Sequence, residues 1–355
     1  MVSVVVVHSV AWMNLDHPIA AAVYPALDRF MRFGVPIFVF LTSYVLVHTL
    51  RNRPLQALRF TRGRVERVVV PFLSWVVIYL AAYVLLRMVS IDSPSNVLKL
   101  LWDGTVAGHL YFLGVACQFY LLFLALPRSR RGALLLCAVA VPLQLTLSAA
   151  RAAGWHVPPP FDIVFGQQAQ WFFVWWIGYY AVGALAAWYR EPLLRGLRTF
   201  RPVALLALAV TGPLALIDMT RAGAQGYDQI FRPATLLLTL AVVAALLSLA
   251  PRPSWAGGGR LEVLAQRSLG VYLVHPLVLL AAGRLVQSGW LPLNFAGPFI
   301  LTLCTLLVVV AVVVLLSQAM VGWLAWLPGG WLLGWRREAR TRRLPIGGAS
   351  RIPAT

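Results

Sequence analysis

Charged residues are scarce in this chain. Only 12% of its 355 residues are Asp, Glu, Lys or Arg, whereas 60% are hydrophobic; soluble domains carry about 25% charged residues. The mean hydropathy of +0.79 comes from separate apolar runs, each near the roughly 20 residues that cross a bilayer core. The composition therefore excludes a soluble globular protein and predicts a multispanning membrane protein. No nucleic-acid motif accompanies the net charge of +19, so no nucleic-acid partner is expected.

Cysteine is also rare. Cys117, Cys137 and Cys304 each lie inside an apolar run. They lack the close spacing of a zinc site and the even number of a disulfide framework. We interpret them as small core residues and expect no metal.

The apolar runs predict an all-α fold. Runs such as residues 301–316 are apolar on every face, which excludes the alternating strands of a membrane β-barrel. We expect a bundle of about ten transmembrane helices, at residues 2–15, 33–50, 66–89, 108–127, 132–149, 169–189, 202–219, 232–250, 267–288 and 297–326. The domain assignment is one transmembrane domain over residues 1–335, followed by a basic, disordered tail over residues 336–355.

The basic residues predict the orientation of the bundle. Arg and Lys are retained on the cytoplasmic side of a membrane protein. With both termini in the cytoplasm, 22 of the 30 basic residues fall on that side. The opposite orientation would reverse this bias, so we predict cytoplasmic N- and C-termini.

Two histidines lie inside predicted spans, where ionisable groups are costly and often functional. His8 follows four valines, and His275 lies in the run from Gly270 to Pro276. Each comes about eight residues after the start of its helix, about 12 Å from the cytoplasmic end. They are therefore expected at one depth, where a neutral imidazole can act as a general base. The alternative is that each histidine only fixes helix packing.

An arginine cluster precedes the third predicted span. Arg59, Arg62, Arg64 and Arg67 lie within nine residues. Arg64 and Arg67 are expected on one helix face, where two guanidinium groups can bind phosphates such as those of coenzyme A. The alternatives are an orientation anchor and a site for an anionic lipid headgroup.

Aromatic residues crowd the sixth predicted span, between Trp171 and Tyr180. Interfacial aromatic belts explain most such residues. The alternative is a surface that stacks a sugar ring.

Several stretches together resemble acyltransferase family 3, the bacterial membrane O-acyltransferases with ten helices. They occur in the family's order over about residues 1–280 and comprise the first helix with His8, the run Val35 to Tyr44, the arginine segment leading into Pro71 to Trp75, Gly108 to Leu113, and Ser268 to Pro276. One local departure is Thr42-Ser43-Tyr44, where the family usually has Ser-Gly-Tyr or Ser-Gly-Phe.

The resemblance implies an O-acetyltransferase, an acyltransferase outside the aminoacyl class, in the bacterial cytoplasmic (inner) membrane. It implies transfer of an acyl group, commonly acetyl from acetyl-CoA, to a hydroxyl of an envelope polysaccharide, another carbohydrate or a small secondary metabolite, with membrane lipid as a further partner. His8 matches the family's first-helix histidine, and Arg64 and Arg67 match its Arg-x-x-Arg motif.

These expectations combine into one mechanism. Acyl-CoA docks on Arg64 and Arg67 from the cytoplasm, with Arg59 and Arg62 beside them. His8 removes the proton of the acceptor hydroxyl, or takes the acyl group itself, while His275 orients His8 or relays protons. Oxyanion donors are sought among Tyr44, Tyr111 and Tyr272, with Tyr44 grouped with the histidines as catalytic.

Two other functions remain open at this point. A transporter or flippase for a lipid-linked sugar or small metabolite is also a multispan bundle with a polar cavity, although the related halves common in transporters are not seen. An inactive or regulatory relative is the third reading, because the family's basic residue upstream of the histidine would precede Met1.

Overall fold

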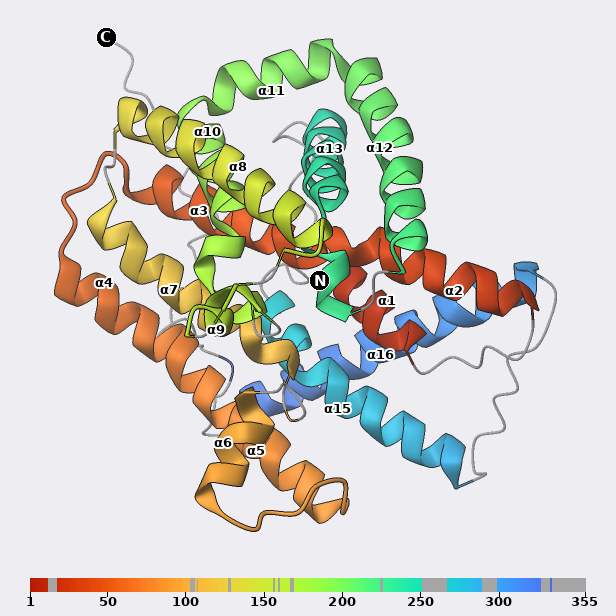
Figure 1. Cartoon of the computed structure of the whole chain (residues 1–355). Coiled ribbons are helices and arrows are strands. Elements are labelled where there is room, and N and C mark those ends of the chain that lie inside the picture. Colours follow the sequence, from red (N-terminus) through yellow and green to blue (C-terminus); the bar gives the residue numbers. More distant parts are fainter. Residues whose placement is uncertain are drawn as a thin grey trace, which may run out of the picture.

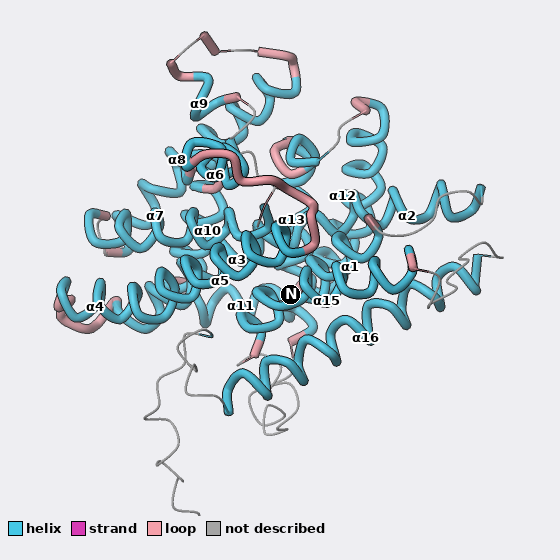
Figure 2. Tube along the Cα trace, turned by 90° about the horizontal axis from the view of Figure 1, so that it is seen from below, coloured by secondary structure: helices cyan, strands magenta, loops and turns pink. Residues whose placement is uncertain are grey.

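The computed structural model of the chain is a bundle of helices. It describes residues 1–11, 18–102, 106, 108–126, 129–155, 157–158, 160–166, 169–223, 226–250, 267–288, 299–326 and 333. Helices and loops, with no strand, make up this described part (Figure 2). The predicted all-α fold is confirmed. The predicted tail, residues 336–355, lies outside the described residues.

The helices follow one another along the chain as shown in Figure 1. The N-terminal half contains α1 (Val2–Val10), α2 (Pro18–Phe30), α3 (Gly34–Leu50), α4 (Ala57–Arg64), α5 (Val70–Leu85), α6 (Pro94–Trp102), α7 (Tyr111–Ala125) and α8 (Arg130–Ala152). The C-terminal half contains α9 (Asp162–Phe165), α10 (Ile177–Trp188), α11 (Arg190–Thr199), α12 (Arg201–Arg221), α13 (Pro233–Leu249), α15 (Ser268–Gln287) and α16 (Phe299–Trp326).

The length and composition of the helices are those of a membrane protein. Six helical segments among the described residues are long and apolar enough to cross a membrane: Ala21–Leu50, Ala57–Leu85, Gly108–Ala125, Arg130–Ala152, Arg201–Arg221 and Leu307–Leu324. Shorter apolar helices occupy Ile177–Trp188, Pro233–Leu249 and Ser268–Arg284. A helix therefore occupies each predicted run, while the count of ten spans and their orientation stay predictions.

The second predicted span starts earlier than expected. The helical path already begins at Pro18 and passes through a 3₁₀ turn, Met31–Phe33, into α3. Charged residues at positions 28–32 suggested a loop. In the structure Arg32 instead forms an ion pair with Asp28 four residues earlier, at 2.7 Å, so both charges are neutralised within the helix.

The sixth predicted span is shorter than expected. Only Ile177–Trp188 is α-helical, and the aromatic residues before it lie in 3₁₀ turns, Ala169–Trp171 and Phe173–Trp175. Irregular backbone inside a membrane protein must have its polar groups satisfied by protein. Gln118 on α7 does this, because its amide donates to the Trp171 carbonyl at 2.6 Å and accepts from the Phe173 N–H at 3.1 Å.

The packing of α3 against α10 relies on small residues. Gly183 lies so close to α3 that an added Cβ would be 2.2 Å from both the Phe40 carbonyl oxygen and the Ser43 hydroxyl. Without a hydrophobic force between helices in lipid, such close approach supplies the attraction. Ser43, at the position where the family usually has glycine, is fully buried, so the glycine of this contact is on α10 instead.

The close contact at Gly183 predicts that a larger residue at this position lowers the stability of the folded protein. We expect Gly183→Ala to destabilise the purified protein by about 1–3 kcal/mol, because backbone must shift to admit the methyl group. Thermal unfolding in detergent measures the effect. Gly196→Ala on α11 is the matched control, since nothing lies within 4 Å of an added Cβ there. It should be neutral or slightly stabilising, because alanine favours helix. Equal melting of the two variants would show that the α3–α10 contact is loose.

Candidate functional site

Three histidines meet where α1, α7 and α15 converge. His8 is on α1, His275 is on α15, and His109 lies in the 3₁₀ turn Gly108–Leu110 that leads into α7. The His8 ring centroid is 5.2 Å from that of His275 and 6.3 Å from that of His109. The His109 and His275 centroids are 5.8 Å apart. The predicted pairing of His8 with His275 is present in the structure, and His109, expected at a helix end, joins it.

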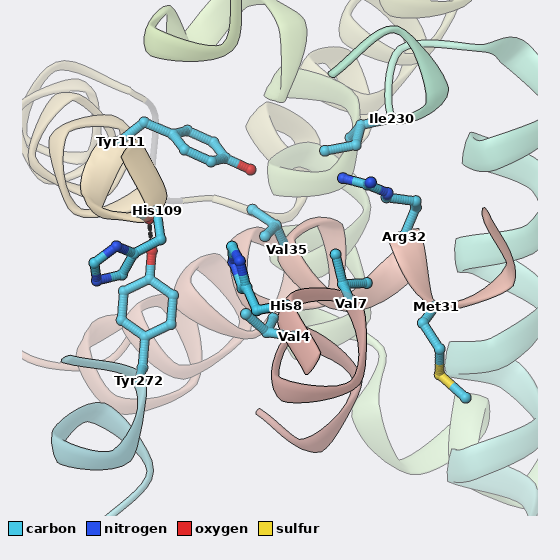
Figure 3. A pocket seen from close by; sticks show the side chains of 11 residues that line it. Val4, Val7, His8, Met31, Arg32, Val35, His109, Tyr111, Ile230 and Tyr272 are labelled. Atoms are coloured by element: carbon cyan, nitrogen blue, oxygen red, sulfur yellow. Dashed lines mark hydrogen bonds between the residues drawn. The ribbon is translucent and has the colours of Figure 1, made fainter. Parts of the chain in front are cut away.

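A cavity of about 120 Å³ opens beside this cluster (Figure 3), and we name it the histidine cavity. It is lined by Val4, Val7, His8, Met31, Arg32, Gly34, Val35, His109, Tyr111, Ile230 and Tyr272. The His8 ring is partly exposed to it. His275 is fully buried behind His8 and does not line it. Of the two predicted histidines, His8 is therefore the one that a substrate in this cavity can reach.

Backbone hydrogen bonds fix the inner histidines. His275 Nδ1 lies 3.1 Å from the Val271 carbonyl oxygen and 2.9 Å from that of Tyr272. A carbonyl only accepts, so Nδ1 carries the hydrogen and Nε2 of the neutral ring keeps its lone pair. That Nε2 atom, like Nε2 of His109, is buried with no hydrogen-bond partner among the described residues.

Two tyrosines hold α15 in place against its neighbours. The Tyr272 hydroxyl donates to the backbone carbonyl of His109, as the dashed line in Figure 3 shows. The Tyr79 hydroxyl on α5 donates to the Leu273 carbonyl at 2.7 Å. The ring of Tyr79 also packs edge-on against His109, at 4.8 Å between centroids. The histidine cluster is therefore enclosed by a fixed frame.

The three tyrosines considered as oxyanion donors separate in the structure. The Tyr111 hydroxyl points into the histidine cavity (Figure 3). Tyr272 forms part of the cavity wall, with its hydroxyl committed to His109. Tyr44 is stacked between Phe40 and His48 along α3 and lines neither cavity described here. Tyr44 therefore lies in a different packing cluster, apart from the three histidines, and its place in the catalytic group stays a prediction.

Arg32 is a site residue that sequence reasoning missed. Its guanidinium lines the histidine cavity on the side opposite His109 (Figure 3). One terminal nitrogen donates to both carboxylate oxygens of Asp28, at 2.8 and 2.7 Å. The predicted start of the span at residue 33 placed Arg32 in a loop. Only the continuous helix from α2 to α3 directs it toward His8.

A second cavity, of about 270 Å³, lies on the other side of Tyr272, and we name it the arginine cavity. It is lined by Phe38, Leu41, Thr42, Val45, Leu46, Arg64, Phe112, Tyr120, Ser268, Leu269 and Tyr272. The Arg64 guanidinium lies over the rings of Phe60 and Tyr120, at 5.1 and 4.9 Å from their centroids. These rings hold the charge of Arg64 at the cavity.

The other three cluster arginines do not line this cavity. Arg67 and Arg59 are exposed, and Arg62 forms an ion pair with Glu66 at 2.9 Å on the surface. A π-helical segment, Val65–Val69, follows Arg64 directly. Its wider turn changes the α-helical spacing on which the shared face of Arg64 and Arg67 was predicted, and such segments often mark functional sites.

Two tryptophans that precede α10 pack against the ring of Tyr111. The ring of Trp176 stacks on Tyr111 at 5.9 Å, and Trp171 meets Tyr111 edge-on at 6.3 Å. Trp171 also lies parallel to Trp102 on α6, with 6.4 Å between centroids. The predicted belt residues thus pack largely on one another and on the site.

No group of three or more His, Cys, Asp or Glu side chains in the described part of the chain has the geometry to hold a metal ion.

The chain matches a known protein family. The model of the acyltransferase domain of acyltransferase family 3 matches residues 1–318. The matched region contains the three histidines, Arg64 and both cavities. No curated protein and no solved structure matches the chain.

Proposed function

Because the chain belongs to acyltransferase family 3, we propose that it transfers an acetyl group from acetyl-CoA to a hydroxyl of a carbohydrate or another envelope or secondary-metabolite acceptor. Family membership makes it a membrane acyltransferase that acts on hydroxyl groups. The observation that carries the proposal is the pair of cavities that meet at Tyr272, one with His8 in its wall and the other with Arg64. Donor and acceptor can thus approach one reaction centre from opposite sides.

The reaction at this centre needs a base. The acceptor oxygen attacks the thioester carbonyl carbon as an imidazole nitrogen of His8 takes the hydroxyl proton. The carbon–sulfur bond then breaks, and the leaving thiolate of coenzyme A receives that proton. The products are the ester and free coenzyme A. His8 supports this role because its ring alone among the three has both a position in the cavity wall and partial exposure to the cavity.

Tyr111 is the donor that we assign to the developing oxyanion. Its hydroxyl is directed into the cavity that holds His8, and Tyr272 contributes to the wall of the same cavity. His275 and His109 act as positioning residues behind His8. Arg32 lies across the cavity, where its guanidinium N–H groups can donate to an oxygen of the acceptor.

We assign Arg64 to the binding of the acyl donor, acetyl-CoA. Its charge at the mouth of the arginine cavity suits a phosphate of the coenzyme. Arg67, Arg62 and Arg59 extend this positive surface outward and attract the coenzyme at longer range. In the bilayer we propose ten spans with both termini in the cytoplasm of a bacterial inner membrane, which places Arg64 on the side where acetyl-CoA is made.

His8→Ala tests the assignment of the base. We expect kcat to fall by about 10²- to 10⁴-fold, because the variant loses general-base catalysis. Purified protein is given radiolabelled acetyl-CoA and a glycan mixture, and labelled product is counted. His48→Ala is the matched control, since His48 is exposed at the end of α3. Full transfer by the His8 variant would remove His8 from the mechanism. Movement of substrate without any covalent product would indicate a transporter instead.

Paired tyrosine variants test the oxyanion donor. We expect Tyr111→Phe to lower kcat by about 10²-fold or more, since one donor to an oxyanion contributes that much. KM for acetyl-CoA should change little. Tyr44→Phe should retain wild-type kcat, because Tyr44 does not line the histidine cavity. The reverse order of effects would restore the sequence-based grouping of Tyr44 with the histidines.

Arginine variants test donor binding. We expect Arg64→Ala to raise KM for acetyl-CoA about tenfold or more, since a hydrogen bond to a charged group contributes about 1.5–3 kcal/mol. Arg67→Ala should raise it by a factor of a few at most, as for other exposed charges. Initial rates at varied acetyl-CoA give both values. An unchanged KM in the Arg64 variant would leave this arginine with a role in orientation only.

A further inference from the structure

The wall between the two cavities is made of three aromatic rings. Phe38 on α3, Phe112 on α7 and Tyr272 on α15 meet there. The centroids of Phe38 and Phe112 are 5.5 Å apart, and those rings lie 6.4 and 6.1 Å from Tyr272. Such distances are those of direct ring contact. The three rings are therefore in mutual contact where the arginine cavity adjoins the histidine cavity.

This wall is only one side chain thick. Tyr272 lines both cavities. On α3, Val35 lines the histidine cavity and Phe38 lines the arginine cavity; at a rise of about 1.5 Å per residue their Cα atoms differ by about 4.5 Å along the axis. On α7, Tyr111 and Phe112 divide between the cavities in the same way. The two spaces therefore adjoin at these aromatic side chains.

The three rings are not held equally. Tyr272 is fixed through its hydroxyl, which donates to the His109 carbonyl. A phenylalanine ring has no polar atom to anchor it, so Phe38 and Phe112 are held by packing alone. Phe38 is also only partly buried, because one face of its ring meets the arginine cavity. The two phenylalanines are thus the movable part of the wall, and Tyr272 is the fixed part.

We propose that Phe38 and Phe112, closing against Tyr272, gate the passage of the acyl group from the arginine cavity to His8 and limit the length of the chain that passes. The inference rests on the proposed function, since it concerns the donor of that reaction. An acyl chain that follows the thioester needs a passage as long as itself, and two large rings leave room only for a short chain. The closed wall also keeps water in the histidine cavity from the thioester until an acceptor is bound.

Acyl-chain selectivity tests the gate. Wild type, Phe38→Ala and Phe112→Ala are compared for kcat/KM with acetyl-CoA and with hexanoyl-CoA. We expect the hexanoyl-to-acetyl ratio to rise about tenfold or more in each variant, because removing bulk that rejects methylenes is worth at least this factor. The control is Phe123→Ala, a buried phenylalanine of the same helix α7 that lines neither cavity. It should leave the ratio unchanged.

The possible results separate the gate from the function. An unchanged ratio in folded Phe38 and Phe112 variants that still transfer acetyl would overturn the gate. If either alanine variant does not fold, Phe38→Leu and Phe112→Leu retain most of the apolar volume and are measured in the same way. Failure of wild type to transfer acetyl from acetyl-CoA contradicts the proposed function, and the gate is then decided by labelling.

The labelling experiment does not depend on turnover. Val35→Cys places a thiol in the histidine cavity. The membrane-impermeant reagent methanethiosulfonate-ethyltrimethylammonium is added to sealed vesicles on the side that Arg64 faces, and labelling of the parent protein is subtracted. We expect Val35→Cys to be protected, and to react several times faster when Phe112→Ala is added. Equal rates in the two proteins would show that the aromatic wall does not separate the cavities.

Discussion

The hydrogen bond from the Tyr272 hydroxyl to the His109 carbonyl is the contact on which the rest of the site depends. It joins α15 to the turn that begins α7, and these two elements supply His275 and His109. It also fixes the one ring that lines both cavities. A carbonyl at the start of a helix can accept an intrahelical bond and has a second lone pair, so the tyrosine bond links two elements without costing the helix a bond.

The same requirement for satisfied polar groups shapes the irregular part of the bundle. In lipid, backbone outside a helix survives only where protein supplies its hydrogen bonds. Gln118 bonds to Trp171 and Phe173, and Gln144 accepts from the Gly178 N–H at 2.7 Å. The apolar pattern predicts a helix over residues 169–176. The glutamine side chains instead supply hydrogen bonds to backbone groups in and next to this non-α-helical stretch. The aromatic rings that they position then pack around Tyr111.

The sequence alone predicted those features that depend on a single physical property, such as the length of an apolar run. Apolar length located the helices, and the cost of a histidine in lipid singled out His8 and His275, which prove to be neighbours. His109 was missed because it stands at a predicted helix end, where a solvated histidine is ordinary. Arg32 was missed because charged residues close together in sequence, such as Arg32 and Asp28, suggest a polar loop. In the structure these two residues form an ion pair within a helix. Tyr44 lies apart from the histidines with which it was grouped, since the depth of a residue along a helix does not give the direction of its side chain. The positions of these three side chains depend on packing between distant segments, which local sequence patterns do not encode.

The geometry of the cluster also orders the three histidines. A base must reach substrate, and His8 and His109 both line the cavity whereas His275 does not. Of these two rings, His8 is the less buried and lies nearer to His275. His275 has its Nδ1 hydrogen committed to two carbonyls, so its remaining lone pair faces the interior of the cluster. A single base flanked by two imidazoles keeps polar neighbours around the proton that it takes, in a region where water is scarce. A lone histidine at that depth would have to hold the charge in an apolar setting, at much greater cost. In the mechanism proposed above, His275 and His109 therefore supply polar neighbours for the base, and His275 does so without lining the cavity that admits substrate.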